Sequence, residues 1–137
     1  MRGPEPVRLL LDTHIWLWSL LAPDRLGRRV ARELESPRNE VWLSPISAWE
    51  VLVLAWKGRI SLREKPEAWV RNVLKELHFK EAPINHEVAI RSEVLDLPHG
   101  DPADRFLVAT ALVYELTLVT ADDRLLRARG LSVLPNR

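Results

Sequence analysis

The sequence contains no cysteine, no glutamine and a single methionine among its 137 residues. The absence of cysteine excludes disulfides, zinc–thiolate centres and thiol catalysis, and it is compatible with a reducing compartment. Neither charge dominates, because 20 Lys and Arg against 19 Asp and Glu leave a formal net charge of +1. The strongly basic composition that indicates nucleic acid or an anionic membrane is therefore missing. Any partner has to be inferred from local chemistry.

A long hydrophobic run is missing as well. The most apolar stretch, residues 7–22, is interrupted by Asp12 and His14, which leaves runs shorter than the ~20 residues of a membrane span. No small-residue cleavage site follows it. We expect no contact with a membrane and a cytoplasmic location. Because 47% of the residues are apolar, we expect residues 1–137 to form a single domain, with residues 1–6 flexible.

Short apolar runs alternate with helical patterns along the chain, without an internal repeat. The predicted strands are continuously apolar, which is typical of parallel strands that are covered on both faces. The sequence therefore predicts an α/β fold, a three-layer αβα sandwich around a parallel sheet of about five strands. The strands are expected at 7–11, 41–43, 79–84, 116–120 and 131–134, and the helices at 15–21, 24–35, 44–56, 66–77, 85–95 and 103–115, with a short helix closed by Gly130.

The seven aspartates concentrate at predicted strand ends and helix starts. Asp12 ends the first strand, Asp101 and Asp104 open the helix before the fourth strand, and Asp122 and Asp123 follow that strand. In a parallel α/β sheet these positions share one edge, where ligands bind. Carboxylates gathered there repel one another unless a cation neutralises them. Oxygen ligands alone favour Mg²⁺ or Mn²⁺, which predicts metal-dependent phosphodiester hydrolysis.

Each of these acids also has an ordinary structural explanation. Aspartate is a favoured N-cap, so Asp12, Asp104 or Asp122 taken singly could simply cap a helix. Asp101 and Asp123 are expected to be surface or loop carboxylates. The grouping of the acids, rather than any single one, is what favours a site.

Glu50 lies in a helix whose start can be placed in two ways. Ser47 and Glu50 fit the S-x-x-E capping box, in which the glutamate binds a backbone N–H at the helix start. A start at Ser44, with Pro45 as the first helical residue, instead places Glu50 in the second turn, where it is no cap.

The chain has six tryptophans. Four of them, Trp16, Trp18, Trp49 and Trp56, are most simply expected in the core or between helices, since tryptophan is highly buried on average. The alternative is that some of them form an exposed apolar patch for a partner.

Four ordered segments resemble the signature segments of PIN-domain proteins, specifically the VapC-type ribonuclease toxins. These segments read LLLDTH at 9–14, ISAWEV at 46–51 with GRI at 58–60, HGDPADRFLVATA at 99–111 and LVTAD at 118–122. Each is common alone, but the four in this order span nearly the whole chain. The resemblance implies an endoribonuclease that uses Mg²⁺ or Mn²⁺ to cleave RNA, a small cognate antitoxin that inhibits it, and a homodimer built on the helices at 15–21 and 44–56.

The resemblance also implies roles for individual residues. Asp12 and Asp104 would bind the metal, Glu50 would position the attacking water, and Asp122 would be the fourth acid of the catalytic site. Thr120 would hold a carboxylate or a water beside them.

The sequence departs from the family pattern at two positions. Ala103 stands where relatives often have phenylalanine, which we expect to alter packing only. Leu54 stands where they often have lysine, which removes a possible phosphate contact; Lys57, Arg59 and Arg105 are the candidate substitutes. Two other readings of the acids stay open, namely a phosphatase or receiver-like phospho-accepting domain and a non-catalytic metal-binding interaction module.

Overall fold

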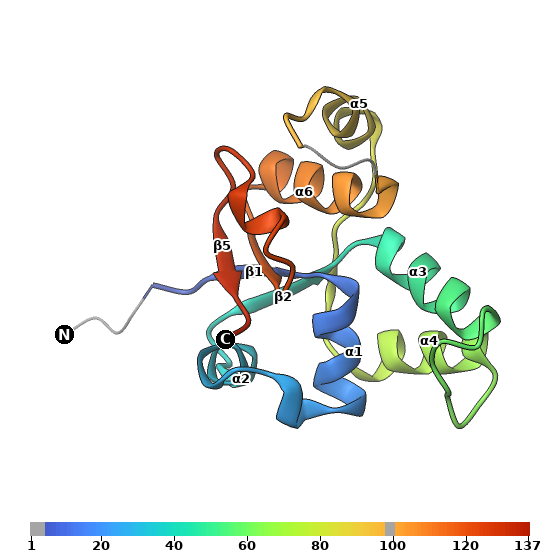
Figure 1. Ribbon diagram of the computed structural model, residues 1–137. Helices are drawn as coiled ribbons and strands as arrows, with labels where there is room; N and C mark the ends of the chain where they lie inside the picture. Colours follow the sequence, from blue (N-terminus) through green and yellow to red (C-terminus); the bar gives the residue numbers. More distant parts are fainter. Residues whose placement is uncertain (1–4, 98–100) are drawn as a thin grey trace.

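The computed structural model describes residues 5–97 and 101–137 (Figure 1). Residues 1–6 are expected to be flexible, and four of them, residues 1–4, lie outside the described residues. Residues 99 and 100 of the third family segment lie outside them as well. The strands are β1 Arg8–Leu11, β2 Glu40–Leu43, β3 Lys80–Glu81, β4 Thr117–Thr120 and β5 Val133–Pro135. The helices are α1 Thr13–Leu21, α2 Arg28–Glu35, α3 Pro45–Trp56, α4 Pro66–Glu76, α5 His86–Val94 and α6 Pro102–Tyr114, with 3-10 turns at Pro23–Arg25 and Leu125–Arg127.

The five strands form one parallel sheet in the order β3-β2-β1-β4-β5. Helices cover both of its faces, so the predicted αβα sandwich is confirmed (Figure 1). The chain starts at the centre of the sheet with β1, adds β2 and β3 on one side, and then crosses back to add β4 and β5 on the other. The strand order therefore reverses between β1 and β4. In open α/β sheets, ligands bind at the carboxyl ends of the strands beside such a reversal.

After its exposed first residue, strand β1 is buried on both faces, which explains its run of three leucines. Leu9 and Leu11 belong to a core cluster with Trp16 of α1. Leu10 belongs to a second cluster with Leu107 of α6. Figure 1 shows α5 and α6 above the sheet and α1, α2 and α4 below it. Because side chains alternate across a strand, one four-residue strand supplies both cores.

Several predicted boundaries are wrong for local reasons. The helix predicted at 24–35 begins four residues later, because a 3-10 turn precedes it and Gly27 is its N-cap. The strand predicted at 79–84 is reduced to the two residues of β3, which pair only with β2 at the edge of the sheet. The short helix expected before Gly130 is a single 3-10 turn. Within the described ranges, no helix is long and apolar enough to cross a membrane.

The tryptophans divide between core and surface. Trp16 is fully buried, and Trp18 is partly buried beneath the Arg25 guanidinium, which lies 4.2 Å from the ring centre. Trp49 and Trp56 are 56% and 85% exposed, so the expectation that they belong to the core is wrong. They share one side of α3 with Leu52, which is also exposed, because positions three and seven residues apart lie on one helix face. The α3 stripe, defined as Trp49, Leu52 and Trp56, is therefore an apolar surface that the described part of the chain leaves uncovered.

Candidate active site

Asp12 lies directly after β1, at the centre of the sheet, and is 7% exposed. Its Oδ1 caps α1 by accepting a hydrogen bond of 2.8 Å from the backbone N–H of Ile15, and its Oδ2 accepts one from the Thr120 hydroxyl. Burial raises the pKa of Asp12 above its ordinary 3.8, although these two hydrogen bonds oppose the rise. The negative charge of Asp12 is therefore under-compensated, which is the condition that a bound cation relieves.

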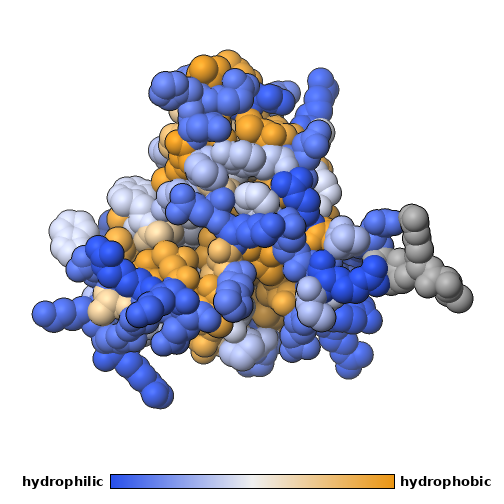
Figure 2. All heavy atoms as spheres, turned by 180° about the vertical axis from the view of Figure 1, so that it is seen from behind, coloured by the Kyte–Doolittle hydropathy of each residue, from blue (hydrophilic) through white to orange (hydrophobic). Residues whose placement is uncertain are grey.

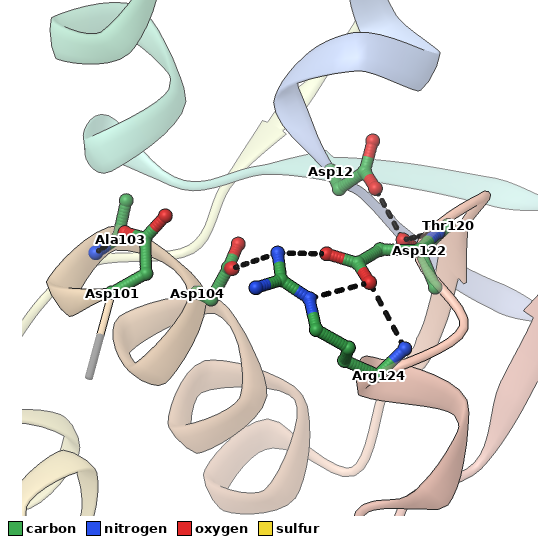
Figure 3. Close-up of polar contacts among 7 residues, drawn as sticks. All are labelled: Asp12, Asp101, Ala103, Asp104, Thr120, Asp122 and Arg124. Carbon is green, nitrogen blue, oxygen red and sulfur yellow. Dashed lines mark hydrogen bonds and ion pairs between the residues drawn. The ribbon is translucent and has the colours of Figure 1, made fainter. Parts of the chain in front are cut away.

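Thr120 connects this carboxylate to the end of β4. It is fully buried as the last residue of the strand, and besides donating to Asp12 it accepts a 3.0 Å hydrogen bond from the backbone N–H of Asp122. One hydroxyl thus fixes both an acid after β1 and the backbone of an acid after β4. This arrangement places the two acids on either side of the reversal in strand order (Figure 3).

Glu50 projects from the second turn of α3. The helix begins at Pro45 with Ser44 as its N-cap, and the Ser44 side chain accepts from the backbone N–H of Ile46, so the capping-box alternative is wrong. The Oε1 of Glu50 instead accepts a 2.5 Å hydrogen bond from the Thr13 hydroxyl. Burial raises the pKa of Glu50 above its ordinary 4.5, this hydrogen bond opposes the rise, and the nearby charges of Asp101 and Asp104 add to it.

We expect the metal-free Glu50→Gln variant to melt at a higher temperature than the parent protein at pH 7. Because the folded-state pKa is raised, folding favours the protonated form of Glu50, and the stability that this form contributes is lost as the pH rises through that pKa. The gain in melting temperature should therefore shrink between pH 7 and pH 4. Thermal unfolding followed by circular dichroism across this range checks it, with the exposed Glu76→Gln as a matched control for the loss of one negative charge. A variant that melts lower than the parent at pH 7 would contradict the electrostatic account.

Asp104 lies in the first turn of α6, whereas the N-cap of that helix is Asp101, whose side chain accepts a 3.0 Å hydrogen bond from the backbone N–H of Ala103. The sequence predicts that Asp101 and Asp104 open this helix, and it assigns Asp101 to the surface or a loop. Asp101 does serve a structural role as a cap, but it also faces the acidic pocket. Asp123 is exposed and does not line that pocket.

Arg124 lies between Asp104 and Asp122 (Figure 3). Its Nη2 is 2.8 Å from Asp122 Oδ2 and 3.8 Å from Asp104 Oδ2, while its Nε and its backbone N–H donate to Asp122 Oδ1 at 3.1 and 2.9 Å. These contacts, chiefly those with Asp122, raise the pKa of Arg124, so the guanidinium stays protonated. Sequence reasoning missed this residue. The only available signal was an arginine two residues after a predicted acid.

The four acids named from the sequence face a common pocket of about 130 Å³. They come from the end of β1, the second turn of α3, the first turn of α6 and the loop after β4, so the fold gathers segments that are far apart in the sequence. The lining consists of Asp12, Thr13, His14, Glu50, Asp101, Asp104, Leu107, Asp122 and Arg124.

This pocket has the donor chemistry of a site for a hard cation. Its carboxylates offer the oxygen donors that Mg²⁺ and Mn²⁺ prefer. Burial raises the pKa of Asp12 and of Glu50, and the charge of Asp104 adds to the rise in both. Among the described residues, however, no three His, Asp or Glu side chains stand close enough together to hold an ion as they are. The acids would have to move toward one another, and Arg124 now lies between two of them.

Arg105, which the sequence makes a candidate phosphate contact, does not line the pocket. Its guanidinium donates to the backbone carbonyls of Ser92, Glu93, Leu95 and Leu97 over 2.9–3.2 Å, and so closes the C-terminal end of α5. Leu54 packs against the core. The other candidates, Lys57 and Arg59, are exposed beyond the end of α3 and do not line the pocket.

We expect Arg105→Ala to lower the free energy of unfolding by about 1–3 kcal/mol, since carbonyls that lose a charged donor are left poorly satisfied. Arg105→Lys should recover only part of this loss. The planar guanidinium donates to four carbonyls in different directions, and a single ammonium group cannot reach all of them. Urea unfolding of the three proteins measures the difference. Full recovery in the lysine variant would show that charge, not the fork, matters.

Comparison with known proteins gives a consistent result. The family model described as PIN domain matches residues 9–131. Ribonuclease VapC22 of Mycobacterium tuberculosis is 33% identical over 118 residues, which cover 85% of this chain and 88% of that protein.

Solved structures resemble the chain over nearly its full length. A toxin–antitoxin complex from Klebsiella pneumoniae contains a chain that is 25% identical, with a TM-score of 0.60 and coverage of 92% of this chain and 95% of the other. VapBC2 from Rickettsia felis, bound to a DNA fragment from the promoter, has a TM-score of 0.70 at 15% identity, with coverage of 96% and 100%. At that identity the likeness concerns the fold alone.

Proposed function

The chain belongs to the PIN-domain family, and on that premise we propose that it is a Mg²⁺- or Mn²⁺-dependent endoribonuclease, the toxin of a toxin–antitoxin pair. The observation behind the proposal is the meeting of Asp12, Glu50, Asp104 and Asp122 in one pocket at the reversal in strand order. The similarity to a protein named as a ribonuclease supports the same reading.

Asp12 and Asp104 are the residues proposed to hold the metal. When bound, such an ion supplies an activated water and stabilises the charge that develops on a phosphodiester. Thr120 fixes one oxygen of Asp12 and the backbone N–H of Ile15 fixes the other, so the carboxylate has a defined orientation before any ion arrives. Asp122 adds a fourth negative charge from the loop after β4.

Glu50 is proposed to position the water that attacks the phosphorus and to accept its proton. The Thr13 hydroxyl orients one oxygen of Glu50. The raised pKa of Glu50 brings this carboxylate closer to the neutral range, in which a general base works best. Both properties are compatible with a base that acts on a water.

We further propose two protein partners, a small cognate antitoxin and a second copy of this chain. The α3 stripe supplies apolar area for such an interface, and Ile90 and Val94 on α5 are exposed as well. Figure 2 shows hydrophobic atoms on the surface at the top of the molecule, where α5 lies. Large exposed apolar side chains in groups are typical of interaction surfaces. The similar Klebsiella pneumoniae structure is a toxin–antitoxin complex, which supports the antitoxin.

The proposed activity is tested by incubating the purified chain with end-labelled RNA in Mg²⁺, in Mn²⁺ and in EDTA. We expect internal cleavage with either ion and none in EDTA. A phosphatase would instead release inorganic phosphate from a small phosphomonoester, and a receiver-like domain would form an acid-stable, base-labile aspartyl phosphate with acetyl phosphate. A non-catalytic metal-binding module would bind the ion and leave the RNA intact. Any of these three results without cleavage would overturn the proposal.

A further inference from the structure

Arg124 binds the acidic pocket as an internal cation. Its Nε and Nη2 form a two-pronged contact with both carboxylate oxygens of Asp122, at 3.1 and 2.8 Å, and the same Nη2 is 3.8 Å from Asp104. The backbone N–H of Arg124 adds a further hydrogen bond to Asp122. The guanidinium therefore bridges an acid of α6 to an acid of the loop after β4 (Figure 3).

The charge of Arg124 is well matched to the pocket. Of the described residues that line it, five are acidic and Arg124 is the only arginine or lysine. The segments around the pocket, namely the junction of β1 and α1, the helix α3 and the start of α6, bring carboxylates and no lysine or arginine to the lining; the ring of His14 is the other titratable group there. Among the described lining residues, this guanidinium supplies the positive charge that pairs with Asp122 and Asp104.

The side chain of Arg124 is held in place by its ion pairs with Asp122 and Asp104 and not by packing. Its side chain is 59% exposed, whereas the side chain of Asp104 is only 17% exposed. The contact with Asp104, at 3.8 Å, is the longer of the two ion pairs. A partly exposed ion pair of this kind contributes little and is screened by salt, so the guanidinium can leave Asp104 at small cost while it keeps Asp122.

We propose that Arg124 is a positioning residue that occupies the cation site in the metal-free protein and that a divalent ion must displace it from Asp104 in order to bind. This inference rests on the proposed metal-dependent function. The ion and the guanidinium compete for the same carboxylate oxygens, and two positive charges cannot share Asp104 without repulsion. The competition also accounts for the absence, among the described residues, of three acids already gathered for an ion.

The test is the affinity of the full chain for Mn²⁺, measured by calorimetric titration and by the electron paramagnetic resonance of free Mn²⁺. Arg124→Gln removes the competing charge and keeps a side chain of similar reach, so it should bind Mn²⁺ about tenfold more tightly than the parent. Arg124→Lys should fall between the two. Arg127→Gln, an exposed arginine of the following 3-10 turn that does not line the pocket, is the matched control and should stay within about twofold of the parent.

A second readout needs no ion. In EDTA at low salt, Arg124→Gln should melt below the parent because the acids lose their counter-charge, and the gap should close at about 1 M salt, where the screening length falls to ~3 Å. Equal or weaker Mn²⁺ binding by Arg124→Gln overturns the inference and leaves the proposed function standing. Absence of Mn²⁺ binding in every protein overturns the proposed metal dependence, and the displacement with it.

Discussion

Replacing Asp12 with asparagine is expected to lower RNA cleavage by about 10³-fold or more while the fold is retained. Asparagine has the same shape, and its Oδ1 can still accept from the backbone N–H of Ile15, so the cap of α1 survives. The neutral amide, however, removes a negative charge from the position that is proposed to hold the ion. Single-turnover cleavage at saturating Mg²⁺, with circular dichroism as a check on folding, measures the loss.

The matched control is Asp123→Asn. This exposed acid lies one residue from Asp122 and outside the pocket lining, so the variant changes the net charge by the same amount and should keep cleavage within about twofold. Full activity in Asp12→Asn would remove Asp12 from the proposed site. An equal loss in both variants would indicate a general charge effect on RNA binding.

The fold could be predicted from the sequence because parallel strands leave a clear signal. Three consecutive leucines in β1, Leu9 to Leu11, are apolar as burial on both faces requires, and the helical patterns between strands leave few alternatives to a covered parallel sheet. The edge strand β3 shows the limit of this signal. Lys80 and Glu81 are exposed and polar, so their assignment to a strand depends on the neighbouring β2 and not on their own sequence.

The meeting of the aspartates in one pocket was predictable because strand ends and helix starts share one edge of such a sheet. Glu50, in contrast, was assigned to the site only through the family resemblance. What could not be predicted is where long side chains point. Arg124 reaches back to acids on either side of it, and Arg105 turns away to carbonyls 8–13 residues earlier. Both arginines lie within two residues of a predicted acid. Their distance from that acid in the sequence therefore cannot show that Arg124 enters the pocket and that Arg105 binds the end of a helix.

The exposure of Trp49 and Trp56 was missed for a related reason. Apolar residues on nearly every side of a helix predict that the helix is fully buried, and α3 has that composition. One of its faces packs against α4 and α6, whereas the α3 stripe is left open. The sequence of a single chain does not distinguish a face that is covered within the chain from one that a partner covers.

The net charge of +1 also gains a structural meaning. Five of the nineteen acidic residues line one pocket, so the rest of the chain carries a surplus of positive charge. A metal-free pocket would repel the phosphates of RNA, and the positive charge of an ion bound there would weaken that repulsion. The near-neutral sum therefore conceals an acidic site within a basic remainder, and it does not argue against a nucleic-acid substrate.

Trp16→Ala is expected to lower the free energy of unfolding by about 3–5 kcal/mol, the range for large aromatic side chains removed from a core. Trp16 is fully buried in α1, and its ring contacts those of Trp69 and Phe79, with centroids 6.0 and 6.3 Å apart. It joins α1, whose first residue follows Asp12, to α4 and to the segment before β3. Urea unfolding monitored by far-UV circular dichroism measures the loss, and the variant should also lose activity as the folded fraction falls.

Trp16→Phe separates packing from polarity at the same position. Within the described residues, the buried Nε1 of Trp16 has no hydrogen-bond partner, and an unsatisfied buried donor costs about 1–3 kcal/mol. Phenylalanine removes this donor and keeps an aromatic ring against Trp69 and Phe79, so the relief offsets part of the lost volume. We therefore expect Trp16→Phe to cost less than half as much as Trp16→Ala. An equal cost in the two variants would mean that the indole N–H finds a partner in solution, such as a water in the neighbouring cavity of about 290 Å³ that Trp16 lines.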